Sequence, residues 1–258
     1  MKRTGMCSVT FRNKSAEEII ALAKRNGLEY VEWGGDVHVP AGDFSAAEKV
    51  RMLCKNEGIK ISSYGSYYRF DGFDDFVTVS KTAKILGAET IRVWAGSKNS
   101  KDFSLKEFAD LIGEVRKCAD YAAANGQTIA FEYHYGTYCD NALSALKLLR
   151  EADRDNVKTY WQPMYWLNAS EEERFAADKL SIEALKDKIV NVHVYCWKNA
   201  SDRRALSEGS EQWREYLALL PCGNCYLEFV KDDAPCQLEK DAAELIRLIK
   251  DDEACKKK

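Results

Sequence analysis

The chain has 258 residues, of which 38 are lysine or arginine and 41 are aspartate or glutamate, so its formal net charge is -3. Charges of both signs are interspersed along the chain, which argues against nucleic acid or an anionic membrane as a partner. No stretch approaches the ~18 consecutive apolar residues of a membrane-spanning helix, and the start lacks the apolar run of a signal peptide. We therefore expect a soluble, cytoplasmic protein whose nine scattered cysteines are reduced thiols.

Eight short runs rich in β-branched or aromatic residues alternate with longer stretches of helical period. The predicted strands are residues 4–10, 28–33, 59–64, 89–95, 127–134, 157–162, 189–195 and 225–230. The predicted helices are residues 15–27, 44–58, 74–87, 104–126, 141–152, 171–187, 210–220 and 237–250. Ser15, Ser104 and Asp140 stand at or just before the start of three of these helices and are candidate N-caps.

Eight strand–helix units at this length predict a closed (β/α)8 TIM barrel, with residues 1–258 forming a single domain. An open doubly wound sheet is the alternative, and it would carry a glycine-rich phosphate-binding turn after its first strand. The segment MCSVTFRNKS, residues 6–15, contains no such turn. Residues 251–258, with the sequence DDEACKKK, are expected to form a solvated, frayed tail.

The polar residues of the predicted strands share one side of each strand. Successive side chains of a barrel strand alternate between the barrel interior and the helix layer. The side chains that this parity turns inward at the carboxyl ends of four consecutive strands are Glu132, Gln162, His193 and Glu228. Barrel enzymes build their active sites at that end. The sequence therefore predicts that the four side chains converge.

Two carboxylates, an imidazole and an amide oxygen make a mostly hard set of metal ligands. We expect them to hold Mn2+ or Mg2+, with Zn2+ or Co2+ as alternatives. A structural alternative is that each acid pairs with a buried cation, for which Arg92, inward by parity, and Lys158 are the candidates. We favour a shared metal, because burying several charges for structure alone is costly.

At these strand ends the sequence resembles the xylose isomerase-like TIM barrels, in particular the sugar phosphate isomerase/epimerase family related to ketose 3-epimerases. The segments that carry the resemblance are GMCSVTF, YVEWGGDVHV, FEYHYG, VNVHVYCW and YLEF. The resemblance implies a metal held by the residues at positions 132, 162, 193 and 228. Two positions depart from the family pattern. Gln162 stands where aspartate is usual, and Tyr195 stands where many relatives carry lysine.

The resemblance also implies a divalent-metal-dependent isomerase or epimerase that acts on a sugar or sugar phosphate. Glu132 and Glu228 would move protons next to a carbonyl group, through an enediolate that the metal stabilises. A lyase or dehydratase of a keto-sugar or keto-inositol is an alternative that begins with the same proton abstraction. A non-catalytic sugar-binding barrel is a third, because the oxygen of Gln162 is neutral and binds metal more weakly. Homo-oligomers, as dimers or tetramers, are common in the family.

A DNA-repair endonuclease of the same fold is a fourth reading. Its site needs several zinc ions and many histidine ligands, whereas the whole chain contains three histidines. We therefore set this reading aside.

Further residues near the strand ends are predicted to contact the substrate. They are Glu32, Trp33, His38, Tyr64, Trp94, His134, Tyr195 and Arg203. His134 would orient Glu132 or bond to a substrate hydroxyl. Arg203 and Arg204 would either clamp an acidic group or, as we favour, lie in a solvated loop. The segment CGNC, residues 222–225, is similar to a redox or zinc motif, but it precedes the last strand and we predict no function for it.

Overall fold

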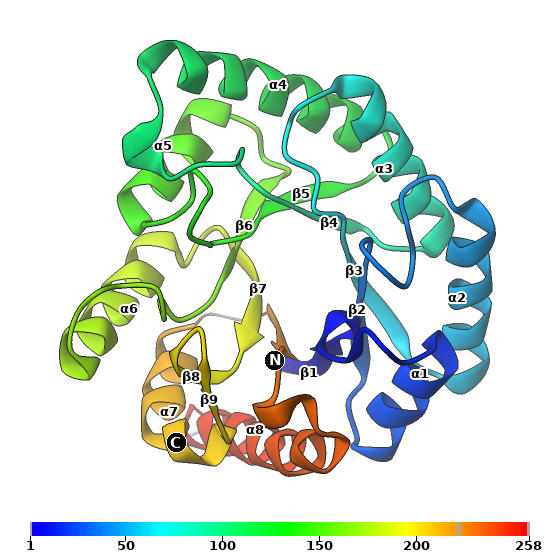
Figure 1. Cartoon of the computed structure of the whole chain (residues 1–258), viewed down its shortest axis with the longest axis vertical. Helices are drawn as coiled ribbons and strands as arrows, with labels where there is room; N and C mark the ends of the chain where they lie inside the picture. Colours follow the sequence, from blue (N-terminus) through cyan, green and yellow to red (C-terminus); the bar gives the residue numbers. More distant parts are fainter. Residues whose placement is uncertain (1, 221–222, 257–258) are drawn as a thin grey trace.

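The computed structural model describes residues 2–220 and 223–256. Within these residues eight parallel strands close into a barrel in the order β1-β10-β7-β6-β5-β4-β3-β2, which confirms the predicted (β/α)8 fold. Figure 1 looks down this barrel and shows the helices as a ring around the strands. The barrel strands are β1 (Lys2–Cys7), β2 (Tyr30–Gly34), β3 (Lys60–Gly65), β4 (Thr90–Val93), β5 (Thr128–Phe131), β6 (Val157–Trp161), β7 (Ile189–Val194) and β10 (Gly223–Leu227).

The helices pack on the outside of the barrel. They are α1 (Ala16–Arg25), α2 (Phe44–Glu57), α3 (Phe73–Leu86), α4 (Leu105–Ala124), α5 (Ala142–Ala152), α6 (Glu171–Leu185), α7 (Ser210–Leu219) and α8 (Pro235–Cys255). Helices α1, α4 and α6 each begin with a capping box formed by a serine and a glutamate, so Ser15 and Ser104 are confirmed as N-caps. Helix α5 corrects the third prediction. Asn141 rather than Asp140 is its cap, and its side chain accepts the N–H of Ser144.

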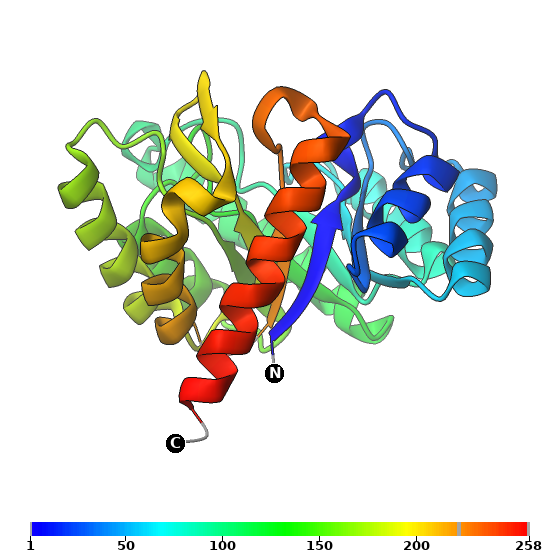
Figure 2. The ribbon, with the colours of Figure 1, turned by 90° about the horizontal axis from the view of Figure 1, so that it is seen from below.

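The last helix is longer than the sequence predicts. Helix α8 continues to Cys255, so residues 251–255 are helical and do not form the expected frayed tail. The physical reason is Asp252, which is buried and accepts hydrogen bonds from Lys2 at 2.8 Å and from Lys256 at 2.9 Å. Figure 2 shows α8 running beside β1 on the outside of the barrel, with the start of β1 and the end of α8 at the same end of the molecule.

An antiparallel hairpin interrupts the alternation after β7. Its strands are β8 (Cys196–Asn199) and β9 (Asp202–Arg204), in a region where the sequence predicts only a loop. The side-chain oxygen of Asn199 accepts the backbone N–H groups of Ser201 and Asp202 and so holds the turn. In Figure 2 the hairpin rises above the carboxyl ends of the barrel strands, at the same end as the loop before α8.

Two apolar layers flank the barrel wall. The inner layer consists of Cys7, Val9, Tyr30, Ala130, Tyr160 and Tyr226. The larger outer layer lies between strands and helices and includes Val31, Trp33 and Val192. This distribution follows the predicted strand parity, which turns the polar residues of the strand ends into the barrel. Among the described helices none combines the length and apolarity needed to cross a membrane.

Candidate active site

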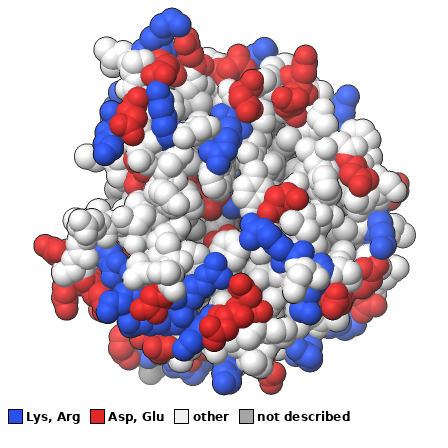
Figure 3. Space-filling view, in the orientation of Figure 1, with Lys and Arg blue, Asp and Glu red and all other residues white. Residues whose placement is uncertain are grey.

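Polar side chains from four neighbouring strands meet at the carboxyl end of the barrel. Glu132 follows β5 and Gln162 follows β6, while His193 lies in β7 and Glu228 follows β10. Each of the four side chains is at most 5% exposed. Figure 3 shows this face hollowed near its middle, with acidic side chains visible inside the hollow and both basic and acidic side chains around its rim. The structure therefore brings together the four side chains that the sequence predicts as metal ligands.

One ring nitrogen of His193 faces three oxygen atoms. Its Nδ1 lies 3.1 Å from Oε1 of Gln162, 3.3 Å from Oε2 of Glu228 and 3.7 Å from Oε1 of Glu132. The amide of Gln162 is fixed in this orientation because its Nε2 donates to the backbone oxygen of Tyr133 at 2.8 Å. The amide oxygen, which is the atom able to bind a cation, therefore points toward the histidine.

These separations suit a single divalent cation. Atoms bound to one ion at about 2.1 Å lie about 3.0 Å apart in octahedral geometry and about 3.4 Å apart in tetrahedral geometry. The distances from Nδ1, between 3.1 and 3.7 Å, are close to these values. Carboxylate, amide and imidazole donors are suitable for Mn2+ or Mg2+, and Zn2+ also accepts them. The residues present thus fit a metal ion.

Arg92 on β4 is a buried cation next to the cluster. It is 1% exposed and forms ion pairs with Glu132 and with Glu32, where its Nε lies 3.2 Å from the carboxylate. The indole N–H of Trp94 donates to the same oxygen of Glu132 at 2.5 Å. The structural alternative of acids paired with a cation therefore holds for these two glutamates, with Arg92 and not Lys158 as the partner. One oxygen of Glu132 is fixed by these contacts, and the other is directed toward His193.

The two glutamates of the cluster have different electrostatic environments. Burial raises the pKa of Glu132, but the charges of Arg92, His134 and His193 together outweigh burial and place that pKa below its usual range. Burial also raises the pKa of Glu228, and the charge of Glu132 raises it further, so that this pKa lies above its usual range although His193 opposes the shift. Glu132 is therefore a fixed carboxylate, whereas Glu228 is better able to accept and release a proton.

Four residues predicted to contact the substrate lie away from the pocket. Glu32 is buried beneath the cluster, where it pairs with Arg92. Trp33 has the opposite parity and belongs to the outer layer. The ring of His38 bonds to a backbone oxygen of the loop before α1, and the hydroxyl of Tyr64 donates to a backbone oxygen of the loop after β2. The structure corrects these assignments, because all four side chains are used in packing and internal bonding.

Three predicted residues, Trp94, His134 and Tyr195, line a pocket of about 160 Å³ above the cluster. The rings of Trp94 and His134 are stacked, with their centres 4.8 Å apart. Arg203 lies near the pocket, where its guanidinium stacks on the ring of Trp197 at 4.8 Å. It also pairs with an aspartate of the loop before α8, so it is neither a free clamp nor a purely solvated residue.

Several residues that line the pocket were not predicted. They are Arg12, Tyr67, Tyr165, Trp197 and Phe229. They lie in loops and in the hairpin, where no periodicity indicates the direction of a side chain. Tyr67 and Phe229 have φ values of 58° and 48°, which bulky residues rarely adopt. The available signal was the density of aromatic residues after β6 and β7, in YWQPMYW and HVYCW.

Together the fold and the cluster define a (β/α)8 barrel of the class that carries a carboxylate and histidine site at the carboxyl ends of its strands. The model of the xylose isomerase-like TIM barrel family matches residues 20–251, and the chain belongs to that family. The family assignment agrees with the resemblance seen in the strand-end segments.

The chain is similar to known proteins in sequence and in structure. The chain is 27% identical over 164 residues to a 3-dehydroshikimate dehydratase of Bacillus anthracis, and the match spans 59% of each chain. The fold is similar to the crystal structure of the probable 3-DHS dehydratase AsbF, which is involved in petrobactin synthesis in the same organism. The superposition has a TM-score of 0.76 at 20% identity and includes 95% of this chain and 99% of the AsbF chain. The IolI protein with a bound zinc atom has a TM-score of 0.76 at 15% identity and covers 96% and 98%. The two structural likenesses show the fold.

Proposed function

We propose that the chain is a divalent-metal-dependent enzyme that removes a proton from the carbon next to a carbonyl group in a small polyhydroxylated compound. The observation that carries the proposal is the convergence of three oxygen atoms on Nδ1 of His193. The proposed metal ligands are Glu132, Gln162, His193 and Glu228, with Mn2+ or Mg2+ favoured and Zn2+ or Co2+ as alternatives. A bound cation supplies the electrophile that polarises the carbonyl oxygen of the substrate.

Glu228 is the proposed general base. In the metal-free protein burial and the charge of Glu132 raise the pKa of the Glu228 carboxyl, and a carboxyl with a raised pKa is a stronger base than an ordinary one. Glu132 is held by Arg92 and Trp94 through one oxygen and remains ionised, so it is suited to hold a cation and poorly suited to donate a proton. Two carboxylates with pKa values pushed apart are the pattern of a site in which each has a separate role.

A site with one base favours elimination of water. Glu228 takes the proton next to the carbonyl group, the C–H electrons form a double bond, and the C–O bond at the following carbon breaks. The same proton then leaves with the hydroxyl group as water. Epimerisation needs a second group that returns a proton to the opposite face, and the ionised Glu132 is a weak proton donor. The relative named 3-dehydroshikimate dehydratase supports the same choice, and we propose a lyase of the dehydratase type.

A sugar isomerase or epimerase is the second candidate, and one observation favours it. Oε1 of Glu132 lies 3.7 Å from Nδ1 of His193, so both glutamates of the cluster face the same position from strands that are not adjacent. Two carboxylates that approach a substrate from different sides are able to exchange protons on both of its faces. The distinction rests on whether Glu132 is ever protonated during the reaction.

The pocket walls fit a compact ring-shaped substrate. Trp94 and His134 form one stacked pair above β4 and β5. Trp197 and Phe229, whose ring centres are 5.8 Å apart, line the part of the pocket next to β7 and β10. Flat aromatic faces contact the C–H groups of a ring over a large area at little cost in conformational entropy. We therefore expect cyclic hydroxy-ketones to bind better than extended chains of similar polarity.

The test incubates the protein in heavy water with keto-inositols, ketoses and 3-dehydroshikimate, at Mn2+ concentrations that saturate it. Nuclear magnetic resonance distinguishes the reactions, because elimination produces an alkene whereas epimerisation produces deuterium at an inverted centre. Glu228→Gln is the negative control, since glutamine keeps the size of the side chain and removes both the proposed base and one charged metal ligand. Alkene formation by the wild type alone supports the proposal. Retained metal without deuterium exchange on any compound would support the non-catalytic sugar-binding barrel.

A further inference from the structure

Glu32 lies beneath the proposed metal site and has no part in the reaction described above. One carboxylate oxygen, Oε2, accepts hydrogen bonds from Ser63 at 2.9 Å and from the hydroxyl of Tyr160 at 2.7 Å. The other oxygen, Oε1, lies 3.2 Å from Nε of Arg92 and 3.5 Å from Nε2 of His193. Glu32 on β2 therefore contacts both the guanidinium of Arg92 on β4 and the imidazole of His193 on β7.

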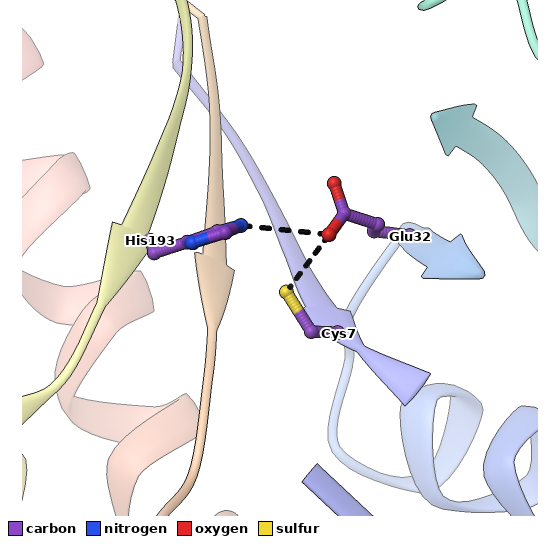
Figure 4. A group of neighbouring side chains, drawn as sticks. All are labelled: Cys7, Glu32 and His193. Atoms are coloured by element: carbon purple, nitrogen blue, oxygen red, sulfur yellow. Dashed lines mark hydrogen bonds and ion pairs between the residues drawn. The ribbon is translucent and has the colours of Figure 1, made fainter. Parts of the chain in front are cut away.

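The second ring nitrogen of His193 is directed at this carboxylate. Figure 4 shows Nε2 of His193 and the thiol of Cys7 both pointing at Glu32, each from its own barrel strand. Nε2 is fully buried and has no hydrogen-bond partner of standard geometry in the part of the chain that the structure describes. Leaving a buried N–H without an acceptor is costly, and the carboxylate at 3.5 Å is placed to accept it.

We propose that Glu32 is a positioning residue that selects the ring nitrogen with which His193 binds the metal, an inference that rests on the proposed function. By accepting the proton of Nε2, the carboxylate leaves Nδ1 facing the oxygen atoms of Gln162, Glu132 and Glu228. Without a metal Nδ1 donates to Oε1 of Gln162, and a bound cation would take the place of that proton. A carboxylate that accepts the second N–H of a metal-binding histidine fixes the ring orientation and makes the ligand nitrogen more basic.

A second cation bound by Cys7, Glu32 and His193 is the competing explanation. The thiol sulfur lies 3.7 Å from Oε1 of Glu32, and the ligand atoms of the three residues lie within 4.8 Å of one another. Two features oppose it. The guanidinium of Arg92 already lies 3.2 Å from the oxygen that would bind the ion, and its charge would repel a cation. Burial and the charge of Glu32 raise the pKa of the Cys7 thiol. The thiol therefore keeps its proton and donates a hydrogen bond to Glu32, whereas a metal ligand would have to be a thiolate.

The first test compares the Mn2+ affinity of the wild type, Glu32→Gln and Ser63→Ala by titration calorimetry. Glu32→Gln keeps the size of the side chain and removes its charge, whereas Ser63→Ala removes one hydrogen bond to the other oxygen of Glu32. We expect the Kd for Mn2+ to rise about 10–100-fold in Glu32→Gln, and by less than about threefold in Ser63→Ala. An unchanged Kd in a Glu32→Gln protein with native near-ultraviolet circular dichroism would overturn the proposal.

A second test uses the wild type alone and does not depend on the folding of a variant. Long-range 15N–1H spectra identify which ring nitrogens of His193 carry a proton. We expect a proton on Nε2 in both the metal-free and the Zn2+-loaded protein, and a proton on Nδ1 in the metal-free protein alone, where Nδ1 donates to Oε1 of Gln162. An Nε2 without a proton, or bound to Zn2+, contradicts the proposal. If the wild type binds two Mn2+ ions per chain and Cys7→Ser binds one, the positioning role of Glu32 is refuted and the second cation site is supported.

The two proposals fail in different ways. If the wild type binds neither Mn2+ nor Zn2+, the proposed function fails, and the metal-free spectrum still decides whether Glu32 holds the proton on Nε2 of His193. If the wild type binds one ion through Nε2, the metal site stands and the positioning role of Glu32 is refuted.

Discussion

Replacement of Arg92 by methionine tests the electrostatic account of the site. Arg92 is 1% exposed and pairs with Glu132 and Glu32, so its removal leaves two buried carboxylates without their cation. Removing one partner of a buried ion pair costs about 3–5 kcal/mol of folding free energy. For a chain of this length each kcal/mol lowers the Tm by about 2–4 °C. We therefore expect the Tm of the metal-free variant to fall by roughly 6–20 °C at neutral pH.

The loss of stability in Arg92→Met depends on pH. In the wild type burial raises the pKa of Glu132 and of Glu32, but Arg92 acting together with His193 outweighs burial and keeps both values low. Carboxyls with a depressed pKa stabilise the fold above their unfolded pKa, and this contribution is lost as the pH falls through the folded value. In the variant burial acts without Arg92, so the carboxyls protonate more readily. The Tm deficit is therefore larger at about pH 8 than at about pH 5.

Thermal unfolding followed by circular dichroism at the two pH values measures both effects. Arg154→Met is the matched control, because Arg154 forms an exposed pair with Asp120 and its loss should change the Tm little at either pH. Added Mn2+ should restore part of the stability of Arg92→Met, since an ion that binds only the folded state stabilises it. A Tm within about 2 °C of the wild type at both pH values would refute the reasoning.

Two further changes follow from other buried contacts. Burial raises the pKa of Asp178 to about 6, so between about pH 4 and pH 6 the folded protein binds more protons than the unfolded chain, and stability falls as the pH rises. As the pH rises through this range, the unfolding free energy of Asp178→Asn measured in urea should therefore increase relative to that of the wild type by up to about 3 kcal/mol. A difference between the two proteins that does not change with pH would contradict this prediction. Lys2→Met removes the cation 2.8 Å from buried Asp252 and should cost about 3 kcal/mol, the lower end of the range for a buried pair, because Lys256 still donates to Asp252 at 2.9 Å. A cost below about 0.5 kcal/mol in the same assay would show that α8 does not depend on this pair.

The cluster of four polar residues could be predicted because strand parity has only two states. Once the apolar residues of β5 and β7 are assigned to the helix layer, Glu132 and His193 must face the barrel interior. The same rule turned Arg92 inward, and the structure places it against Glu132. Alternation of strands and helices along the whole chain was enough to predict the closed barrel, because each unit repeats one local pattern.

The remaining parts of the site depend on information that periodicity does not contain. Parity places Glu32 inside the barrel but does not give its depth, and the residue is buried against Arg92 instead of lining the pocket. Tyr67, Trp197 and Phe229 follow the strand ends in loops and in a hairpin, where side-chain direction is set by tertiary contacts. The helical end of the chain depends on the pairing of Asp252 with Lys2, which is 250 residues away in sequence.

We propose that Glu132, Gln162, His193 and Glu228 together hold one divalent cation. The most direct measurement is the metal content of the wild type and of Glu228→Gln by plasma mass spectrometry, after loading with Mn2+ and dialysis. We expect about one ion per chain in the wild type and a large loss in the variant, because Glu228 supplies one of two charged ligands. A wild type that retains no metal, or a variant that retains as much as the wild type, would contradict it.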